Sequence, residues 1–189
     1  MDSELRTKRL ILKPLCLADA AQIQKLFPQW EVVQFLANRV PWPYPEEGAL
    51  EYCRDIALPQ ADRGEAWHWT LRLMEEPGQV IGAISLTKGD DDNRGFWLGV
   101  PWRGRGLMSE ACAAVNDFWF DTLGFPVMRI PKAEPNTASR CISQKQGMRV
   151  VAQFEKDFVC GRLPAEIWEI TADEWRAFKA GKLQPPPTN

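Results

Sequence analysis

Residues 100–111 read Val100-Pro-Trp-Arg-Gly-Arg-Gly-Leu-Met-Ser-Glu-Ala111, and this stretch decides the fold. The preceding residues, Gly95-Phe-Trp-Leu-Gly-Val100, predict a strand. After the glycines, apolar side chains recur at helical spacing and predict a helix over 107–120. A strand that runs through a glycine turn into a helix directs several backbone N–H groups, and the positive end of the helix dipole, at one point. The stretch therefore predicts a site for an anion such as phosphate.

The residues of this turn favour a phosphate site but not either of two familiar ones. Gly104 and Gly106 let the main chain approach a ligand closely, and Arg103 and Arg105 add positive charge. A dinucleotide-binding fingerprint needs Gly or Ala where this chain has Ser109. A P-loop needs Lys and then Ser or Thr after its second glycine, and the turn lacks that pair. Two alternatives stay open, a plain turn with surface arginines and a nucleotide site of another type.

Strand and helix patterns alternate along the rest of the chain. The predicted strands span residues 9–15, 67–74, 79–86, 95–100, 127–133, 149–159 and 167–171. The predicted helices span residues 17–25, 46–58 (closed by Pro59), 107–120, 137–145 and a short segment after the capping box Thr171-Ala-Asp-Glu174. Residues 38–48 hold three prolines and predict a loop. With no internal repeat and no linker, we expect one α+β domain over 1–183, followed by a proline-rich tail over 184–189.

Composition excludes several classes of function. The net charge of −2 gives no reason to expect a nucleic-acid partner, which normally requires a basic excess. Five cysteines without a CxxC pair indicate reduced thiols rather than disulfides or zinc ligands. A single histidine excludes a multi-histidine metal centre, and we expect no metal. The charged N-terminus has no long apolar run behind it, so we expect no signal peptide and no membrane span, in a cytoplasmic protein.

Four segments together resemble the GNAT superfamily of acetyltransferases. Arg103-Gly-Arg-Gly-Leu-Met108 is similar to the acyl-CoA pyrophosphate motif Arg/Gln-x-x-Gly-x-Gly/Ala, with Met at the final small position. The branch that acetylates the N-termini of ribosomal proteins is closer still, because Gly-x-Gly-x-x-x-Glu-Ala is usual there. The other three segments agree with that branch in order and spacing, and they are 7–15, 40–45 and 133–148. The resemblance covers about residues 7–170.

This resemblance implies a fold and a donor. The fold is a GNAT-type central sheet, mixed but mostly antiparallel and twisted, with a V-shaped splay and flanking helices. The donor is acetyl-CoA, whose pantetheine arm lies in the splay in this family. Its carbonyl would be polarised by backbone N–H groups of Leu98, Gly99 and Val100. Its pyrophosphate would lie on the N–H groups of the turn, namely those of Arg103, Gly104, Arg105, Gly106, Leu107 and Met108.

The resemblance also implies roles for a later helix, where Asn136-x-x-Ser139 matches the family's Asn-x-x-Ser. Asn136 would hydrogen-bond the pantetheine or the base, and it is also a good helix N-cap. Ser139 would approach the departing sulfur and could protonate it. The general base is less defined, because many relatives place a Glu at 93–98 and this chain has none there. The candidates are His68, Glu155 and Asp157, although a lone histidine in a strand is commonly a packing residue.

Aromatic residues predict the acceptor side of the site. The loop over 40–45 carries Trp42 and Tyr44 between prolines, which restrict its conformations. We expect these rings to face Trp67 and Trp69, on either side of His68, across the open end of the cleft.

The function that follows is transfer of an acetyl group from acetyl-CoA to a primary amine, by direct attack in a ternary complex. The acceptor is a small-molecule amine or a protein N-terminus, and a homodimer is left open. The alternative is a non-catalytic acyl-CoA-binding regulatory module that has kept the donor motif and lost its base.

Overall fold

The computed structural model describes residues 3–182, and within them the chain forms two sheets whose strand pairs are all antiparallel. The first sheet has the order β1-β2-β3-β4-β5, with bounds Leu5–Arg6, Leu10–Pro14, Ala66–Leu73, Gly82–Thr87 and Arg94–Leu98. The second sheet has the order β6-β8-β7, in which β6 is Val127–Ala133, β7 is Arg149–Phe158 and β8 is Gly161–Thr171. The predicted α+β class is confirmed. The tail predicted over 184–189 lies outside the described residues.

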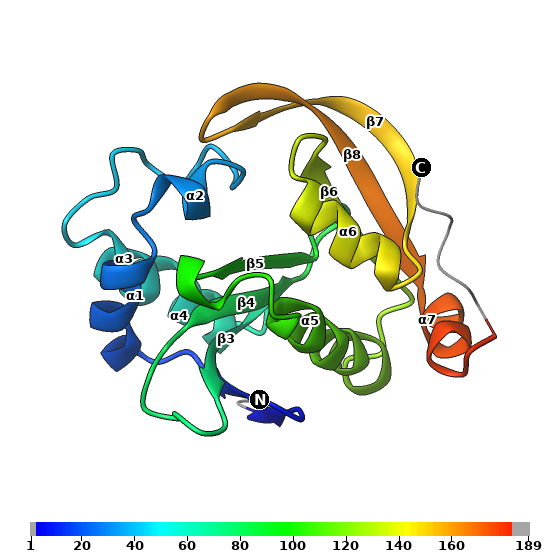
Figure 1. The fold of residues 1–189 in the computed structure, drawn as a ribbon, viewed down its shortest axis with the longest axis horizontal. Coiled ribbons are helices and arrows are strands. Elements are labelled where there is room, and N and C mark those ends of the chain that lie inside the picture. The colour runs from blue at the N-terminus through cyan, green and yellow to red at the C-terminus, as the bar shows by residue number, and fades with distance from the viewer. Residues whose placement is uncertain (1–2, 183–189) are drawn as a thin grey trace.

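Helices flank the sheets, as Figure 1 shows. They are α1 Ala20–Leu26, α2 Trp30–Val33, α3 Gly48–Glu51, α4 Leu58–Asp62, α5 Leu107–Asp117, α6 Thr137–Lys145 and α7 Ala172–Lys179. The capping box predicted at Thr171 and Glu174 is present, and it opens α7. The predicted end of a helix at Pro59 is wrong, because helical backbone continues from Gly48 to Asp62. Pro59 lies at the start of α4, directly after the π-helical stretch Tyr52–Ala57, where the hydrogen-bond pattern of the helix changes.

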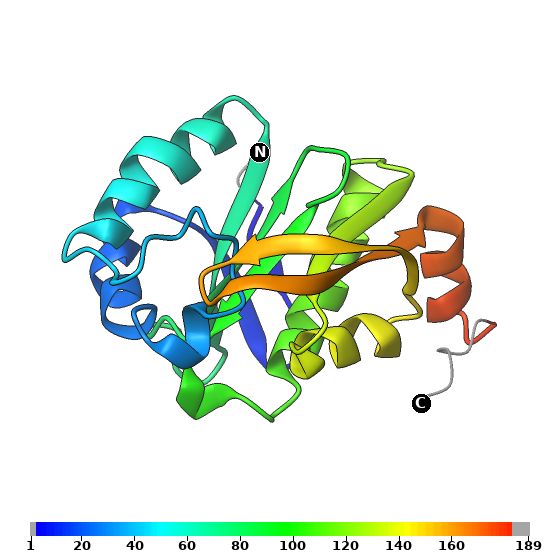
Figure 2. The same cartoon turned by 90° about the horizontal axis from the view of Figure 1, so that it is seen from above.

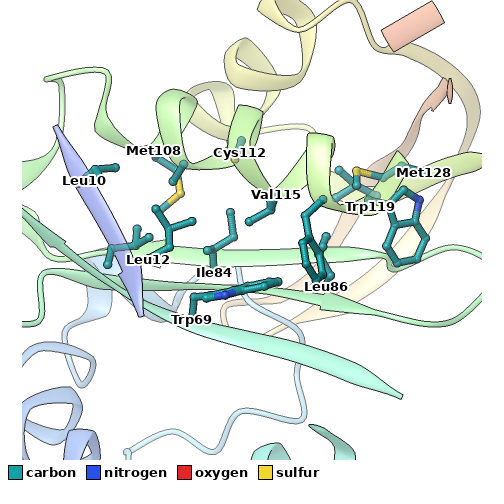
Figure 3. Packing of buried hydrophobic residues seen from close by; sticks show 14 of the residues in the cluster. Leu10, Leu12, Trp69, Ile84, Leu86, Met108, Cys112, Val115, Trp119 and Met128 are labelled. Atoms are coloured by element: carbon teal, nitrogen blue, oxygen red, sulfur yellow. The ribbon is translucent and has the colours of Figure 1, made fainter. Parts of the chain in front are cut away.

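The two faces of the first sheet pack against different helices. On one face, alternate residues of β2, β3 and β4 form the main core with α5, and Figure 3 shows Leu12, Trp69 and Ile84 beneath Met108 and Val115. The opposite face of β5 carries Trp97, which packs with the separate cluster formed by α1, α2 and α3. Because side chains alternate along a strand, neighbouring residues of β3 and β5 must serve different faces. This alternation decides which side chains can reach the site.

The two sheets meet at Asn93, just before β5, and separate beyond it. The Asn93 N–H donates to the carbonyl oxygen of Arg129 at 2.9 Å, and the Asn93 side chain accepts from the Arg129 N–H at 2.8 Å. The same side chain donates to the carbonyl of Gly89 at 2.7 Å. Asn93 is 2 % exposed, so these bonds satisfy polar groups that would otherwise be buried without partners. β5 and β6 therefore start as neighbours and then splay, as the sequence predicted.

The long β7–β8 hairpin closes over the splay. Its tip reaches the segment after α2, where Val159 N–H donates to Leu36 O and Cys160 N–H donates to Gln34 O, each at 3.0 Å. An isolated bridge between Ala37 and Phe158 adds to this junction. Figure 1 shows the hairpin arching from α7 toward α2, and Figure 2 shows it crossing above the first sheet. The hairpin forms a roof whose far end is held by main-chain bonds.

Candidate active site

The glycine turn has the geometry of an anion site. Gly106 is the N-cap of α5 with a φ of 74°, and Gly104 has a φ of 72°. Both angles lie in the left-handed region, where a side chain is strained. No side chain caps the helix, so the N–H groups of Leu107, Met108 and Ser109 lack a capping acceptor. Residues Arg103 to Gly106 are exposed. The turn can therefore take a phosphate on its backbone N–H groups.

A carboxylate that the sequence reasoning did not single out fixes this turn to the rest of the fold. Glu110 accepts from Thr7 Oγ1 at 2.5 Å, from the Arg9 N–H at 2.7 Å and from Arg9 Nε at 2.7 Å. Burial works against the ionised form, but the bonds from Thr7 and Arg9 outweigh it and hold the pKa of Glu110 below its ordinary value. Arg9 Nη1 also donates to the carbonyl of Arg105 at 2.8 Å. The signal in the sequence was the Glu-Ala pair that ends the glycine motif.

The strand before the turn offers fewer free donors than expected. Gly99 N–H donates to Ile81 O on the β4 side, at 2.9 Å. Since N–H groups alternate in direction along a strand, the N–H groups of Leu98 and Phe96 are directed to the open side, toward β6. Arg103 folds back, and its Nε donates to Leu98 O at 3.1 Å. Of the predicted donors at 98–100, the Leu98 N–H faces the splay, and the Gly99 N–H is already bonded to Ile81.

A cavity of about 630 Å³ lies under the roof. Its walls come from α1, the loop over 39–45, the helical segment from Gly48 to Ile56, strands β3 to β7 and the start of α6. Of the site residues predicted from the sequence, five border it, and these are Tyr44, His68, Trp69, Asn136 and Ser139. The splay thus opens into a chamber large enough for a small organic molecule.

At the floor of the cavity, β6 meets the start of α6. Asn136 caps α6 by accepting from the Ser139 N–H at 3.2 Å. Lys132 donates from Nζ to Ser139 Oγ at 2.6 Å, although only 3 % of this lysine is exposed. Burial, and then the charge of Arg94, lower the pKa of Lys132 to about 7, against smaller opposing effects of Cys112 and Asp92. Lys132 is a site residue that the sequence reasoning missed.

A second buried cation lies beside the first. Arg94 is 2 % exposed and donates from Nη1 to Asn116 at 2.5 Å and to Gln146 at 3.1 Å. Gln146 also donates to the carbonyl of Ser109 at 3.2 Å, so this network ties β5 to α5 and to the end of α6. Within residues 3–182 neither Arg94 nor Lys132 forms a salt bridge with a carboxylate. The floor therefore holds two buried basic side chains, and no carboxylate among the described residues is bonded to either.

Aromatic rings line the outer part of the cavity. Tyr44 packs edge-on against Phe27, with ring centroids 4.9 Å apart, and burial raises the pKa of Tyr44 to about 12. Tyr52 lies edge-on to His68 at 6.3 Å. His68 Nε2 is buried and, within the described part of the chain, has no hydrogen-bond partner. An acceptor molecule would meet mostly apolar walls, the His68 ring nitrogen and the carboxylates of Glu51, Asp55 and Asp92.

Several predicted residues are not brought into this chamber. Trp67 and Trp69 lie one residue either side of His68, so the strand directs their rings to the opposite face, where both pack against Phe118. Trp69 borders the cavity, but its side chain is core and its Nε1 donates to Ser3 O at 2.8 Å. The expectation that these two rings face Tyr44 across the cleft is thus corrected by strand alternation.

Trp42, Glu155 and Asp157 also lie outside the lining. Trp42 is 43 % exposed and packs beside Trp30. Glu155 lies 3.8 Å from Arg162 in an exposed ion pair on the hairpin. The hairpin residues that border the cavity are Lys156 and Phe158, and the pleat directs Glu155 and Asp157 to the opposite face. His68 is the one of the three candidate bases that lies in the cavity.

We predict that His68 stays neutral well below its ordinary range. Burial lowers the pKa of His68 to about 4. A chain with one histidine gives one imidazole resonance by NMR, so its titration is unambiguous. The unfolded chain takes up this proton near pH 6.5, so the contribution of His68 to stability is complete above that pH and is lost as the pH falls toward 4. A midpoint near 6.5 in the folded protein would show that the ring is not buried as described.

Within residues 3–182, no three or more His, Cys, Asp or Glu side chains are grouped so that they could hold a metal ion. No helix there is long and apolar enough to cross a membrane.

Solved structures with this fold include several acetyltransferases. The ribosomal L7/L12 alpha-N-protein acetyltransferase RimL, solved with coenzyme A, has a TM-score of 0.77 at 14% identity, over 91% of this chain and 99% of that one. The ribosomal-protein-S5-alanine acetyltransferase from Vibrio fischeri has 0.76 at 14% identity, over 92% and 99%. The microcin C7 self-immunity acetyltransferase MccE, solved with acetyl-CoA and AMP, has 0.73 at 14% identity, over 87% and 93%. At such identities these structures establish the fold.

The family itself is shown by the sequence. No curated protein matches this chain. The acetyltransferase (GNAT) domain, however, matches residues 9–149, which run from the start of β2 through the glycine turn and α6 to the start of β7. The matched span also contains the glycine turn, Asn93 (where the two sheets meet) and Ser139. The chain therefore belongs to the GNAT family of acetyltransferases.

Proposed function

We propose that this protein transfers the acetyl group of acetyl-CoA to a primary amine, by direct attack in a ternary complex. Two features carry the proposal. An uncapped helix N-terminus with two left-handed glycines follows β5, and Ser139, at the start of α6, borders the cavity. That arrangement suits a donor with a pyrophosphate at one end and a thioester at the other. RimL and MccE, which share the fold, were solved with coenzyme A and acetyl-CoA.

The residues suit distinct tasks in that reaction. The turn from Gly104 to Met108 would hold the pyrophosphate, and Leu98 N–H would polarise the thioester carbonyl. The amine nitrogen attacks the carbonyl carbon, the carbon–sulfur bond breaks, and Ser139 gives a proton to the leaving sulfur. His68, neutral at pH 7, would accept a hydrogen bond from the acceptor and hold its attacking nitrogen in place. Five cysteines, all free in the structure, agree with a reducing cytoplasmic setting.

The walls favour a small, largely apolar amine over a protein N-terminus as the acceptor. The cavity is bounded above by the hairpin, whose tip is bonded to the segment after α2 at Val159 and Cys160. An extended polypeptide would need that side of the chamber open. Tyr44 and Trp97, with Phe27 between them, give the outer wall an aromatic character.

Two aromatic substitutions separate the cavity wall from the outer surface. Tyr44→Ala should raise the KM for the acceptor about ten-fold, with the KM for acetyl-CoA nearly unchanged, because one aromatic contact is worth roughly 1–3 kcal/mol. Trp42→Ala removes a larger ring from the same loop, but one that is exposed, so its effect on acceptor KM should be smaller. Steady-state kinetics with both substrates measures this. Equal effects of the two substitutions would mean that the acceptor binds on the outside of the loop.

The assay that tests the proposal follows product by mass spectrometry in a panel of amines given acetyl-CoA. The panel contains aromatic and aliphatic primary amines, amino-acid amides and peptides with free N-termini. We expect an acetylated product from at least one apolar small amine, faster than from any peptide. The competing function is a regulatory module that binds acyl-CoA without catalysis. Tight binding of acetyl-CoA by calorimetry, with no product from any amine, would favour that module.

A further inference from the structure

We propose that Lys132 and Ser139 form a proton relay to the leaving thiolate, in which Lys132 is the proton source and Ser139 the group that meets the sulfur. The inference rests on the proposed function, since it takes the sulfur to lie at Ser139. Lys132 does not touch the reacting atoms itself and acts through the serine. It is therefore a positioning and proton-supplying residue rather than a catalytic one.

The geometry that carries the relay is a single short hydrogen bond in a dry environment. Lys132 Nζ donates to Ser139 Oγ at 2.6 Å, and the lysine is 3 % exposed. A serine hydroxyl that accepts this bond still has its own O–H to donate, and Ser139 borders the cavity. The bond therefore has a direction, from a buried ammonium through a hydroxyl into the chamber. A charge-assisted donor also makes the hydroxyl more acidic than an isolated serine.

The groups around Lys132 leave its ammonium without an ion pair, so its proton can be passed to Ser139. From β5, Arg94 adds a second positive charge, and the Lys132 Nζ lies 5.4 Å from the centre of the Phe96 ring. From α5, Cys112 is fully buried, and burial raises the pKa of its thiol, so it stays neutral. Asp92, before β5, is the acidic group that supports the charged form. None of these holds the ammonium in an ion pair within the described residues.

The acidic residue opposite Lys132 is already occupied. Glu166 of β8 lies across from Lys132 in the strand register. Its carboxylate accepts from Arg140 at 2.9 and 3.1 Å, and from Trp168 Nε1 at 2.9 Å. Arg94, and Lys132 when it is protonated, are thus buried positive charges without a carboxylate partner among the described residues. An anion that forms in the chamber, such as a thiolate, would be stabilised there.

Every proton that the relay moves has a source and a destination. The amine attacks the carbonyl carbon and the carbon–sulfur bond breaks. The sulfur takes the proton of the Ser139 hydroxyl, and the hydroxyl takes a proton from the Lys132 ammonium. The new amide nitrogen releases one proton to water, and Lys132 regains one from water. A donor whose pKa lies near 7 suits this exchange, because it gives up and regains its proton readily at neutral pH.

The first test needs no turnover. Bound coenzyme A is titrated by the ultraviolet absorbance of its thiolate, taken as the difference from the complex with desulfo-coenzyme A, in the wild type and in Lys132→Met. Methionine fills a similar volume without the charge, so the fold and coenzyme A affinity should be kept. We expect the thiolate to appear at a pH lower by about one unit or more in the wild type. Equal midpoints in the two proteins would overturn the relay, whether or not any amine is acetylated.

The second test uses kinetics once an acceptor is known. Lys132→Met should lower kcat at least about ten-fold, and adding it to Ser139→Ala should cost little more, because residues of one relay are not additive. As the pH rises through the pKa of Lys132, its ammonium is lost, so the wild-type kcat has a falling limb, which Lys132→Met and Lys132→Arg should lack. Lys145→Met, exposed on the same helix as Ser139, is the matched control. Additive effects with an unchanged pH profile would show a purely structural role.

Discussion

Gly106→Val is expected to weaken coenzyme A binding at least about 100-fold, which corresponds to about 2.7 kcal/mol. Gly106 has a φ of 74° and caps α5. A β-branched residue is strained at that angle, so the turn must change its conformation or give up about 1–2 kcal/mol. In either case the backbone N–H groups at the start of α5 no longer point at one site. The added side chain also enters the space where a phosphate would approach.

The control for this substitution is Gly124→Val, because Gly124 has the same φ of 74°. It is exposed in the turn before β6, and a Cβ added there meets nothing within 4 Å. The two variants should lose similar amounts of stability in urea unfolding, and only Gly106→Val should lose coenzyme A binding by calorimetry. A folded Gly106→Val protein with wild-type affinity would show that the pyrophosphate binds elsewhere.

Ser139→Ala should lower kcat about 100-fold, with the KM for acetyl-CoA changed by less than about three-fold. The hydroxyl would act on the sulfur as the carbon–sulfur bond breaks, so its loss removes an interaction of the transition state rather than one of the bound substrate. Its loss also leaves the Lys132 ammonium buried without the bond at 2.6 Å. The measurement is steady-state kinetics with saturating acceptor.

Ser143→Ala is the matched control, one turn further along α6. Ser143 is fully buried, does not border the cavity, and its Oγ has no hydrogen-bond partner within the described residues. This substitution should leave kcat unchanged. If Ser139→Ala raised only the KM for acetyl-CoA, the hydroxyl would help to seat the donor and would have no part in the departure of the thiol.

The turn and the cap were predictable from sequence because their geometry is local. Gly104 and Gly106 adopt the conformation for which glycine is suited, and Asn136 caps the helix that follows it. The strand, turn and helix over 95–117 follow from side-chain spacing and glycine alone. The family resemblance then predicted that Ser139 lies near the donor.

The rest of the site could not be predicted in this way, because it depends on contacts between residues distant in sequence. The error over Trp67 and Trp69 was avoidable, since a strand cannot direct three successive side chains to one face. The hydrogen bond from Lys132 to Ser139 could not be predicted from the sequence, because it depends on how β6 and α6 pack against each other. A lysine inside a strand gives no sign of its burial, which is fixed here by Arg94 and α5. The position of the hairpin roof likewise depends on a long-range hydrogen bond, from the Val159 N–H to Leu36 O.

The most direct test of the account is an initial-rate matrix in which acetyl-CoA and the best acceptor amine are both varied. Direct transfer requires both substrates on the protein at once. We therefore predict double-reciprocal lines that intersect, with one acetylated amine formed for each coenzyme A released. Parallel lines, accompanied by acetylation of the protein when acetyl-CoA is added alone, would contradict direct transfer and show that the acetyl group passes through a covalent enzyme intermediate.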